Sequence, residues 1–138
     1  MEKIVAVSGG FDPLHIGHTK LFKEAKKLGD KLVVIVNGDF WLRRKKGKIF
    51  TPLSDRMELI RDNKYVDYVI GWDDGTENVC GALEILKPDI FANGGDRTNK
   101  TTPEVGLCKK LKIKMVFGLC PEEYIRSSSN LLNNYENK

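Results

Sequence analysis

The chain has 138 residues, of which 41% are hydrophobic and 30% are charged, and its formal net charge is +4. This length can close one hydrophobic core of ordinary size but not two independent cores. Much of the charge excess comes from one basic run at residues 43–48, so we expect a small anionic ligand and no nucleic acid. The three cysteines are far apart and lack a Cys-x-x-Cys pair, which favours neither a disulfide framework nor a zinc site.

No apolar stretch approaches the length of a signal peptide or membrane span, so we expect a cytoplasmic protein with no membrane partner. We expect a single domain over residues 1–132, followed by a polar tail over residues 133–138 that frays.

Short apolar runs alternate along the chain with segments of helical periodicity. Strands are expected at residues 4–7, 32–36, 68–70, 90–92 and 114–117. Helices are expected from His18, from Thr51 as N-cap with Pro52 in the first turn, through residues 79–86, and over residues 103–111. This alternation predicts an α/β, Rossmann-like fold: a doubly wound parallel sheet of five strands with helices on both faces.

All the histidines of the chain, His15 and His18, fall in one glycine-rich run that follows the first strand. The run from Ser8 to His18 reads Ser-Gly-Gly-Phe-Asp-Pro-Leu-His-Ile-Gly-His. Glycines allow backbone amides to approach phosphate oxygens, and the start of a helix adds its positive dipole end. Two imidazoles facing one pocket can donate hydrogen bonds to a phosphate and stabilise developing negative charge.

Other polar segments follow further strands. Asn37-Gly38-Asp39 follows the second strand, residues 93–97 follow the fourth, and residues 126–129 lie shortly after the fifth. In a doubly wound sheet these positions share the edge where ligands bind. Each segment alone has an ordinary structural explanation: a tight turn for the glycines, a helix N-cap for the serines and a solvated loop for the basic run. Their joint placement favours a site for a nucleoside triphosphate.

From Gly10 to His18 the chain resembles the signature of the cytidylyltransferase-like nucleotidyltransferase superfamily, whose hallmark is His-x-Gly-His after the first strand. Further positions are similar in order and spacing to heptose 1-phosphate adenylyltransferases, and the same skeleton resembles glycerol-3-phosphate cytidylyltransferases. These positions are residues 36–39, Arg44, Lys46, Gly47, Pro52, Arg56, residues 66–69, Asp74, Thr76, residues 87–89 and residues 94–96.

The resemblance implies that a phosphate oxygen of a small acceptor, such as a sugar or polyol phosphate, attacks the α-phosphorus of CTP or ATP and releases pyrophosphate. It implies three catalytic residues: His15, His18 and Lys46, the last on a mobile basic loop. Arg44 and Asp39 are expected at the acceptor, although Asp39 could instead only cap the following helix. The expected nucleotide-binding residues are Gly9, Gly10, Phe11, Asp12, Gly17, Asp96, Arg126, Ser127, Ser128 and Ser129.

The resemblance also implies a homodimer, and the chemistry implies Mg²⁺ carried by the nucleotide without a protein-held metal site. Two alternatives remain open. One is a fragment similar to class I aminoacyl-tRNA synthetases, which activate amino acids with the same tetrapeptide, His-Ile-Gly-His. The other is a nucleotide-binding sensor without catalysis, which would keep the same glycines. The choice between CTP and ATP, and the identity of the acceptor, stay undecided at this point.

Overall fold

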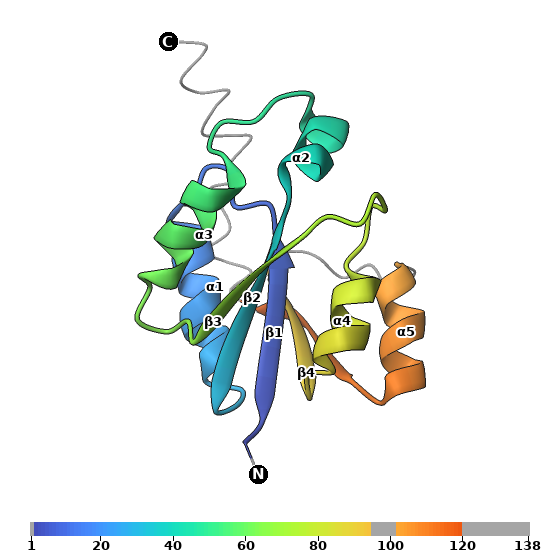
Figure 1. Cartoon of the computed structure of the whole chain (residues 1–138). Helices are drawn as coiled ribbons and strands as arrows, with labels where there is room; N and C mark the ends of the chain where they lie inside the picture. Colours follow the sequence, from blue (N-terminus) through green and yellow to red (C-terminus); the bar gives the residue numbers. More distant parts are fainter. Residues whose placement is uncertain (1, 95–101, 120–138) are drawn as a thin grey trace.

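Strands and helices alternate along the chain in the computed structural model, which describes residues 2–94 and 102–119 (Figure 1). The elements are β1 (Ile4–Gly9), α1 (Ile16–Lys26), β2 (Lys31–Asn37), α2 (Asp39–Lys46), α3 (Leu53–Arg61), β3 (Tyr68–Trp72), α4 (Cys80–Leu86), β4 (Ile90–Gly94), α5 (Pro103–Leu111) and β5 (Lys114–Leu119). Every strand and helix expected from the sequence is present, and all five strands are longer than expected.

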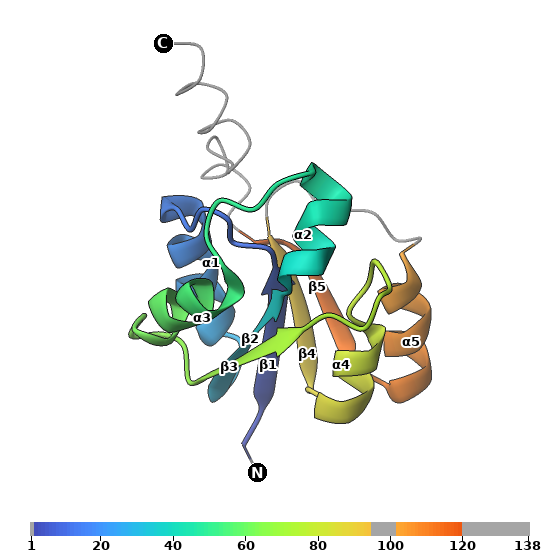
Figure 2. The same ribbon diagram turned by 45° about the horizontal axis from the view of Figure 1, so that its top comes forward.

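The five described strands form one parallel sheet in the order β3-β2-β1-β4-β5. The chain builds outward from β1 to β2 and β3, and then returns to add β4 and β5 on the other side of β1. The connections that leave β1 and β4 therefore diverge, which opens a crevice at the carboxyl ends of these strands. α2 lies beyond the carboxyl ends of β1 and β2, above this crevice (Figure 2). The expected fold class is confirmed.

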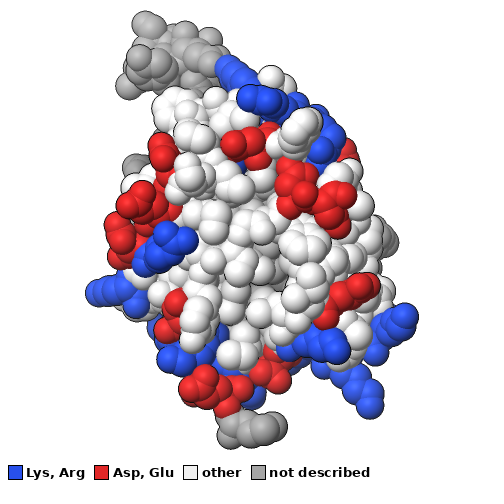
Figure 3. Space-filling view, viewed as in Figure 1, with Lys and Arg blue, Asp and Glu red and all other residues white. Residues whose placement is uncertain are grey.

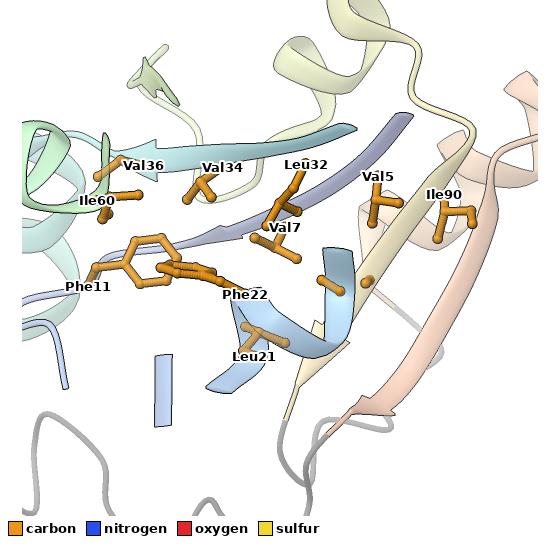
Figure 4. Close-up of a cluster of buried hydrophobic side chains, with 12 residues drawn as sticks. Val5, Val7, Phe11, Leu21, Phe22, Leu32, Val34, Val36, Ile60 and Ile90 are labelled. Atoms are coloured by element: carbon orange, nitrogen blue, oxygen red, sulfur yellow. The ribbon is translucent and has the colours of Figure 1, made fainter. Parts of the chain in front are cut away.

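The sheet buries both of its faces. One cluster joins Val5, Val7 and Val34 to Phe22 of α1 and Ile60 of α3 (Figure 4). The opposite cluster packs alternate strand residues against α4 and α5: Ala6, Ile35, Val79, Ala82, Leu83, Phe91, Cys108 and Ile113. Because neighbouring residues of a strand point to opposite faces, the uninterrupted apolar runs of β1 and β2 supply both clusters at once.

Two local expectations were wrong. The basic run was expected as a mobile loop, but Arg43 to Lys46 form the last turn of α2, which ends at the left-handed Gly47. Thr51 was expected to cap the next helix, but α3 begins after Pro52 and no side chain of its N-cap residue bonds to it. The Leu53 amide instead donates to Asp39 Oδ1 over 3.0 Å, so a residue of α2 caps α3. Among the described residues, no helix is both long and apolar enough to cross a membrane.

Candidate active site

The side chains of the two histidines cap the start of α1 by accepting backbone N–H groups. The Gly17 amide donates to His15 Nδ1 over 3.0 Å, and the His15 amide donates to His18 Nδ1 over 3.2 Å. A ring nitrogen that accepts a hydrogen bond carries no proton, so in the neutral ring the proton is on Nε2. Each ring thus retains one N–H group, at Nε2, that the cap does not use.

Both histidines are held in the neutral form. Burial, together with smaller contributions from His15 and Lys46, lowers the pKa of His18 to about 3. Burial also lowers the pKa of His15, with a smaller contribution from Lys46. The rings stack with their centroids 3.8 Å apart, so two protonated rings would repel each other strongly. The pair therefore offers two uncharged N–H donors, and Lys46 supplies the positive charge beside them.

Lys46 comes from a different part of the chain than the histidines, yet its ammonium lies near enough to shift the pKa of both. It is the last residue of α2 and is exposed to solvent. α2 thus presents an ammonium group to the histidine pair across the crevice. The positive charge of Lys46 and the two neutral donors would both favour an anion in this region.

Gly9 at the end of β1 and Gly10 after it leave room for the side chains of Phe11 and Leu42. A Cβ atom on Gly9 would lie 3.0 Å from Phe11 Cζ, and one on Gly10 would lie 2.9 Å from Leu42 Cδ2 of α2. The buried Phe11 ring meets His18 edge-on, with ring centroids 4.9 Å apart. Phe11 adopts a φ of 54°, a left-handed value that is uncommon outside glycine. The expected phosphate loop therefore also positions His18.

Asp12, which is expected at the nucleotide, makes hydrogen bonds to the backbone of the protein. Its side chain is buried, with 2% of the residue exposed. Its Oδ2 accepts the Phe50 amide over 2.7 Å, and its Oδ1 accepts the Thr51 amide over 2.6 Å. Asp12 thus fixes the chain between α2 and α3 to the phosphate loop, and this observed role is structural.

The two residues expected at the acceptor also make intramolecular bonds. Asp39 Oδ1 accepts from Arg56 Nη2 over 2.7 Å, in addition to capping α3. Arg44 Nη2 donates to Asp73 Oδ1 and to the Thr76 carbonyl, both over 3.2 Å. Arg44 therefore ties α2 to the segment between β3 and α4, which is a positioning role in the structure as observed.

Arg56 is the most buried cation of the region, with 1% of the residue exposed. Besides Asp39, it donates to the carbonyls of Thr51, Gly10 and Asn37 over 2.7–2.8 Å. These carbonyls come from three separate segments: the end of β2, the residue after β1 and the connection between α2 and α3. One planar guanidinium can satisfy all of them because its donors point in fixed, divergent directions. Arg56 thus braces the carboxyl edge of the sheet.

Sequence reasoning missed two other residues of this edge. Asp73 accepts the Trp41 amide over 2.8 Å and so fixes the start of α2. Glu104, in the first turn of α5, lines a cleft beside Lys46. Its one local signal is its place at a helix start, which is common and unspecific. The expected nucleotide contacts Asp96, Arg126, Ser127, Ser128 and Ser129 lie outside the described residues.

Residues 6–135 match the cytidylyltransferase-like family. The bifunctional protein HldE of Streptomyces coelicolor is 42% identical over 132 residues, which cover 94% of this chain but 27% of that protein. The FAD synthase of Pyrococcus abyssi is 43% identical over 94 residues, which cover 67% of this chain and 63% of that protein. This chain therefore spans about a quarter of the length of the bifunctional relative.

A solved structure agrees with these matches. The lipopolysaccharide core biosynthesis protein of Thermoplasma volcanium superposes with a TM-score of 0.70 and 35% sequence identity, covering 85% of this chain and 96% of that one. The chain belongs to the cytidylyltransferase-like family, a family of nucleotidyltransferases. The resemblance inferred from the glycine-rich run and its two histidines is confirmed.

Proposed function

We propose that the chain transfers a nucleoside monophosphate from a nucleoside triphosphate to a small phosphorylated acceptor and releases pyrophosphate. The observation that supports this most directly is the reciprocal cap of His15 and His18, which leaves two Nε2–H donors beside the Lys46 ammonium. A triphosphate undergoing displacement at its α-phosphorus needs such donors and charge where negative charge develops.

In the proposed reaction an oxygen of the acceptor phosphate forms a bond to the α-phosphorus, and the bond from that phosphorus to its bridging oxygen breaks. Pyrophosphate takes the electron pair of the broken bond. His15 and His18 donate hydrogen bonds to the phosphate oxygens, and Lys46 offsets the charge of two approaching anions. No covalent bond to the protein forms.

Mg²⁺ bound to the triphosphate is expected to reduce the repulsion between the reactants. Within residues 2–94 and 102–119, no three His, Cys, Asp or Glu side chains form a cluster that could hold a metal ion.

ATP is the proposed donor, with CTP as the alternative. The similarity to heptose 1-phosphate adenylyltransferases supports ATP, and so does the relative named FAD synthase, because FAD contains an adenylyl group. A sugar or polyol phosphate is the proposed acceptor class, with a phosphorylated flavin as the alternative that the FAD synthase match raises.

A pyrophosphate-release assay tests the proposal. Each of the four ribonucleoside triphosphates is combined with glycerol 3-phosphate, ribose 5-phosphate, a set of hexose and heptose 1-phosphates and FMN, with Mg²⁺ present or chelated. We expect release with ATP and one of these acceptors, dependent on both reactants. Absence of release with every pair would contradict the proposal.

A further inference from the structure

The helix that carries Lys46 has little hold of its own on the rest of the protein. α2 has eight residues, of which only Leu42 is buried. Helices shorter than about 12–15 residues are marginal in water on their own, so contacts from other segments decide how α2 lies. Its N-cap residue is Gly38, which has no side chain to bond to the first turn.

Asp73, in the segment after β3, supplies the missing cap from outside the helix. Its Oδ2 accepts the amide of Trp41, the third residue of α2, over 2.8 Å. N-cap side chains normally accept from the second or third amide of a helix, and a negative charge at this end also interacts favourably with the helix dipole. Gly38 leaves the space for this carboxylate, because a Cβ atom there would overlap the Asp73 side chain.

The other oxygen of the same carboxylate holds the last turn of α2. Asp73 Oδ1 accepts from Arg44 Nη2, with 31% of the Arg44 side chain and 19% of the Asp73 side chain exposed. Figure 3 shows basic side chains gathered over α2 and acidic side chains over the neighbouring segment before α4. One carboxylate therefore contacts both ends of the helix, which fixes its orientation as well as its position.

The orientation of α2 determines where the Lys46 ammonium lies. Lys46 is the last residue of α2, two positions after Arg44, and its charge reaches both histidine rings. A helix of eight residues is about 12 Å long, so a tilt of about 10° at its start moves its far end by roughly 2 Å. Displacing a positioned group by about 1 Å can lower a rate by about 10²-fold. Such a tilt about Leu42 would expose little apolar surface, so the packing of α2 alone does not prevent it.

We propose that Asp73 is a positioning residue for the reaction, which holds α2 in the orientation that presents the Lys46 ammonium to the triphosphate. This role rests on the proposed function and deepens it by assigning a residue that acts through another side chain. Asp73 should therefore affect the binding of a triphosphate only while Lys46 is present.

A double-mutant cycle tests this dependence. Wild type, Asp73→Ala, Lys46→Ala and the variant with both changes are titrated by calorimetry with the α,β-methylene analogues of ATP and CTP. Steady-state kcat and a thermal melt are measured for each protein. Asp30→Ala is the matched control, because Asp30 Oδ2 also accepts a backbone amide, that of Lys3 over 2.7 Å, at the opposite end of the sheet.

We expect Asp73→Ala to raise the Kd of the analogue that wild type binds by about 10- to 100-fold, the range for losing one interaction with a charged group. In the Lys46→Ala background the same change should alter the Kd by less than about twofold. Asp73→Asn keeps an oxygen for the Trp41 amide but loses the charge that faces Arg44, so its Kd should rise less. Asp30→Ala should leave the Kd and kcat unchanged.

An equal rise in Kd with and without Lys46 would overturn the inference, because Asp73 would then act independently of the ammonium. An unchanged Kd in Asp73→Ala would overturn it as well. Should Asp73→Ala fail to fold, the same cycle with Asp73→Asn decides the question by the same criterion. If wild type binds an analogue through Asp73 and Lys46 but releases no pyrophosphate with any acceptor, the proposed function fails while the positioning of Lys46 by Asp73 stands.

Discussion

His15 and His18 use their two ring nitrogens for different purposes. Each Nδ1 accepts a backbone N–H at the start of α1, a task that Ser, Thr, Asp or Glu side chains usually perform at helix starts. Because the cap occupies Nδ1, it also determines the tautomer and the direction of Nε2. The local requirement of the helix therefore prepares two donors for a phosphate.

The neutral state of His18 gives a prediction that NMR can check. The chain has only two histidines, so their ring ¹⁵N signals are easily assigned. With burial, His15 and Lys46 lowering its pKa to about 3, His18 should remain neutral with the proton on Nε2 from pH 8 down to about pH 5. A His18 ring that titrates near pH 6.5, or that carries its proton on Nδ1, would contradict this description.

The same pKa shift has a consequence for stability. Because the folded pKa lies below the unfolded value of 6.5, the unfolded chain binds more protons between pH 6.5 and about 3. The contribution of His18 to the free energy of unfolding is therefore complete above pH 6.5. It is lost as the pH falls, by at most about 1.4 kcal/mol per pH unit. Urea denaturation at pH 7 and pH 5 should show a smaller loss of stability in His18→Asn than in wild type. Equal losses would argue against a shifted pKa.

His18→Asn also separates the cap from the chemistry. An asparagine Oδ1 can accept the His15 amide in place of Nδ1, but the side chain is too short to replace the Nε2–H donor. We expect kcat to fall by about 10²- to 10³-fold, the usual cost of one lost donor in a charge-stabilising site. The melting temperature should change little. His18→Ala loses both the cap acceptor and the Nε2–H donor, so it should lower both kcat and the melting temperature. Wild-type turnover in either variant would rule out His18 as a donor in the reaction.

At the scale of elements, α2 decides whether the basic residues reach the site. Only Leu42 of its eight residues is buried, so its sequence has a weak helical signal and was interpreted as a loop. Contacts from elsewhere in the chain stabilise it. Asp73 accepts the Trp41 amide and pairs with Arg44, and Gly10 leaves room for the Leu42 side chain.

Gly38, the N-cap residue of α2, lies close to Asp73 in the segment after β3. A Cβ atom there would lie 2.7 Å from Asp73 Cβ and 2.9 Å from its Oδ2. Gly38→Ala should therefore displace Asp73 and the start of α2, lowering the free energy of unfolding by about 1–3 kcal/mol and reducing turnover. Urea denaturation measures the first effect and the pyrophosphate assay the second.

Gly106→Ala is the matched control for that change. Gly106 lies within α5, and a Cβ atom there would meet nothing within 4 Å. Alanine is the better helix former, so this variant should be more stable by about 0.4–1 kcal/mol. If Gly38→Ala were as stable as wild type while Gly106→Ala gained stability, the close approach at Gly38 would be incorrect.

At the scale of the whole molecule, the sequence predicted what repeats along the chain or lies within one short segment. The apolar runs identified the strands, and the glycine-rich run identified the histidines. Partners distant in the sequence could not be predicted from local patterns. Asp12, for example, bonds to the amides of residues 50 and 51, which are 38 and 39 positions away. The cleft beside Glu104 was hidden for the same reason, since five separate segments line it.

In the proposed function, the Nε2–H groups of both histidines bind one triphosphate together with Lys46. The most direct measurement is the ring ¹⁵N and ¹H spectrum of His15 and His18 during titration with a non-hydrolysable α,β-methylene analogue of ATP. We predict that both Nε2–H signals shift with the same saturation curve. The Lys46→Ala variant should bind the analogue more weakly, while its two rings, without the analogue, should still carry their protons on Nε2. Saturable binding of the analogue that leaves both Nε2–H signals unmoved would contradict the account.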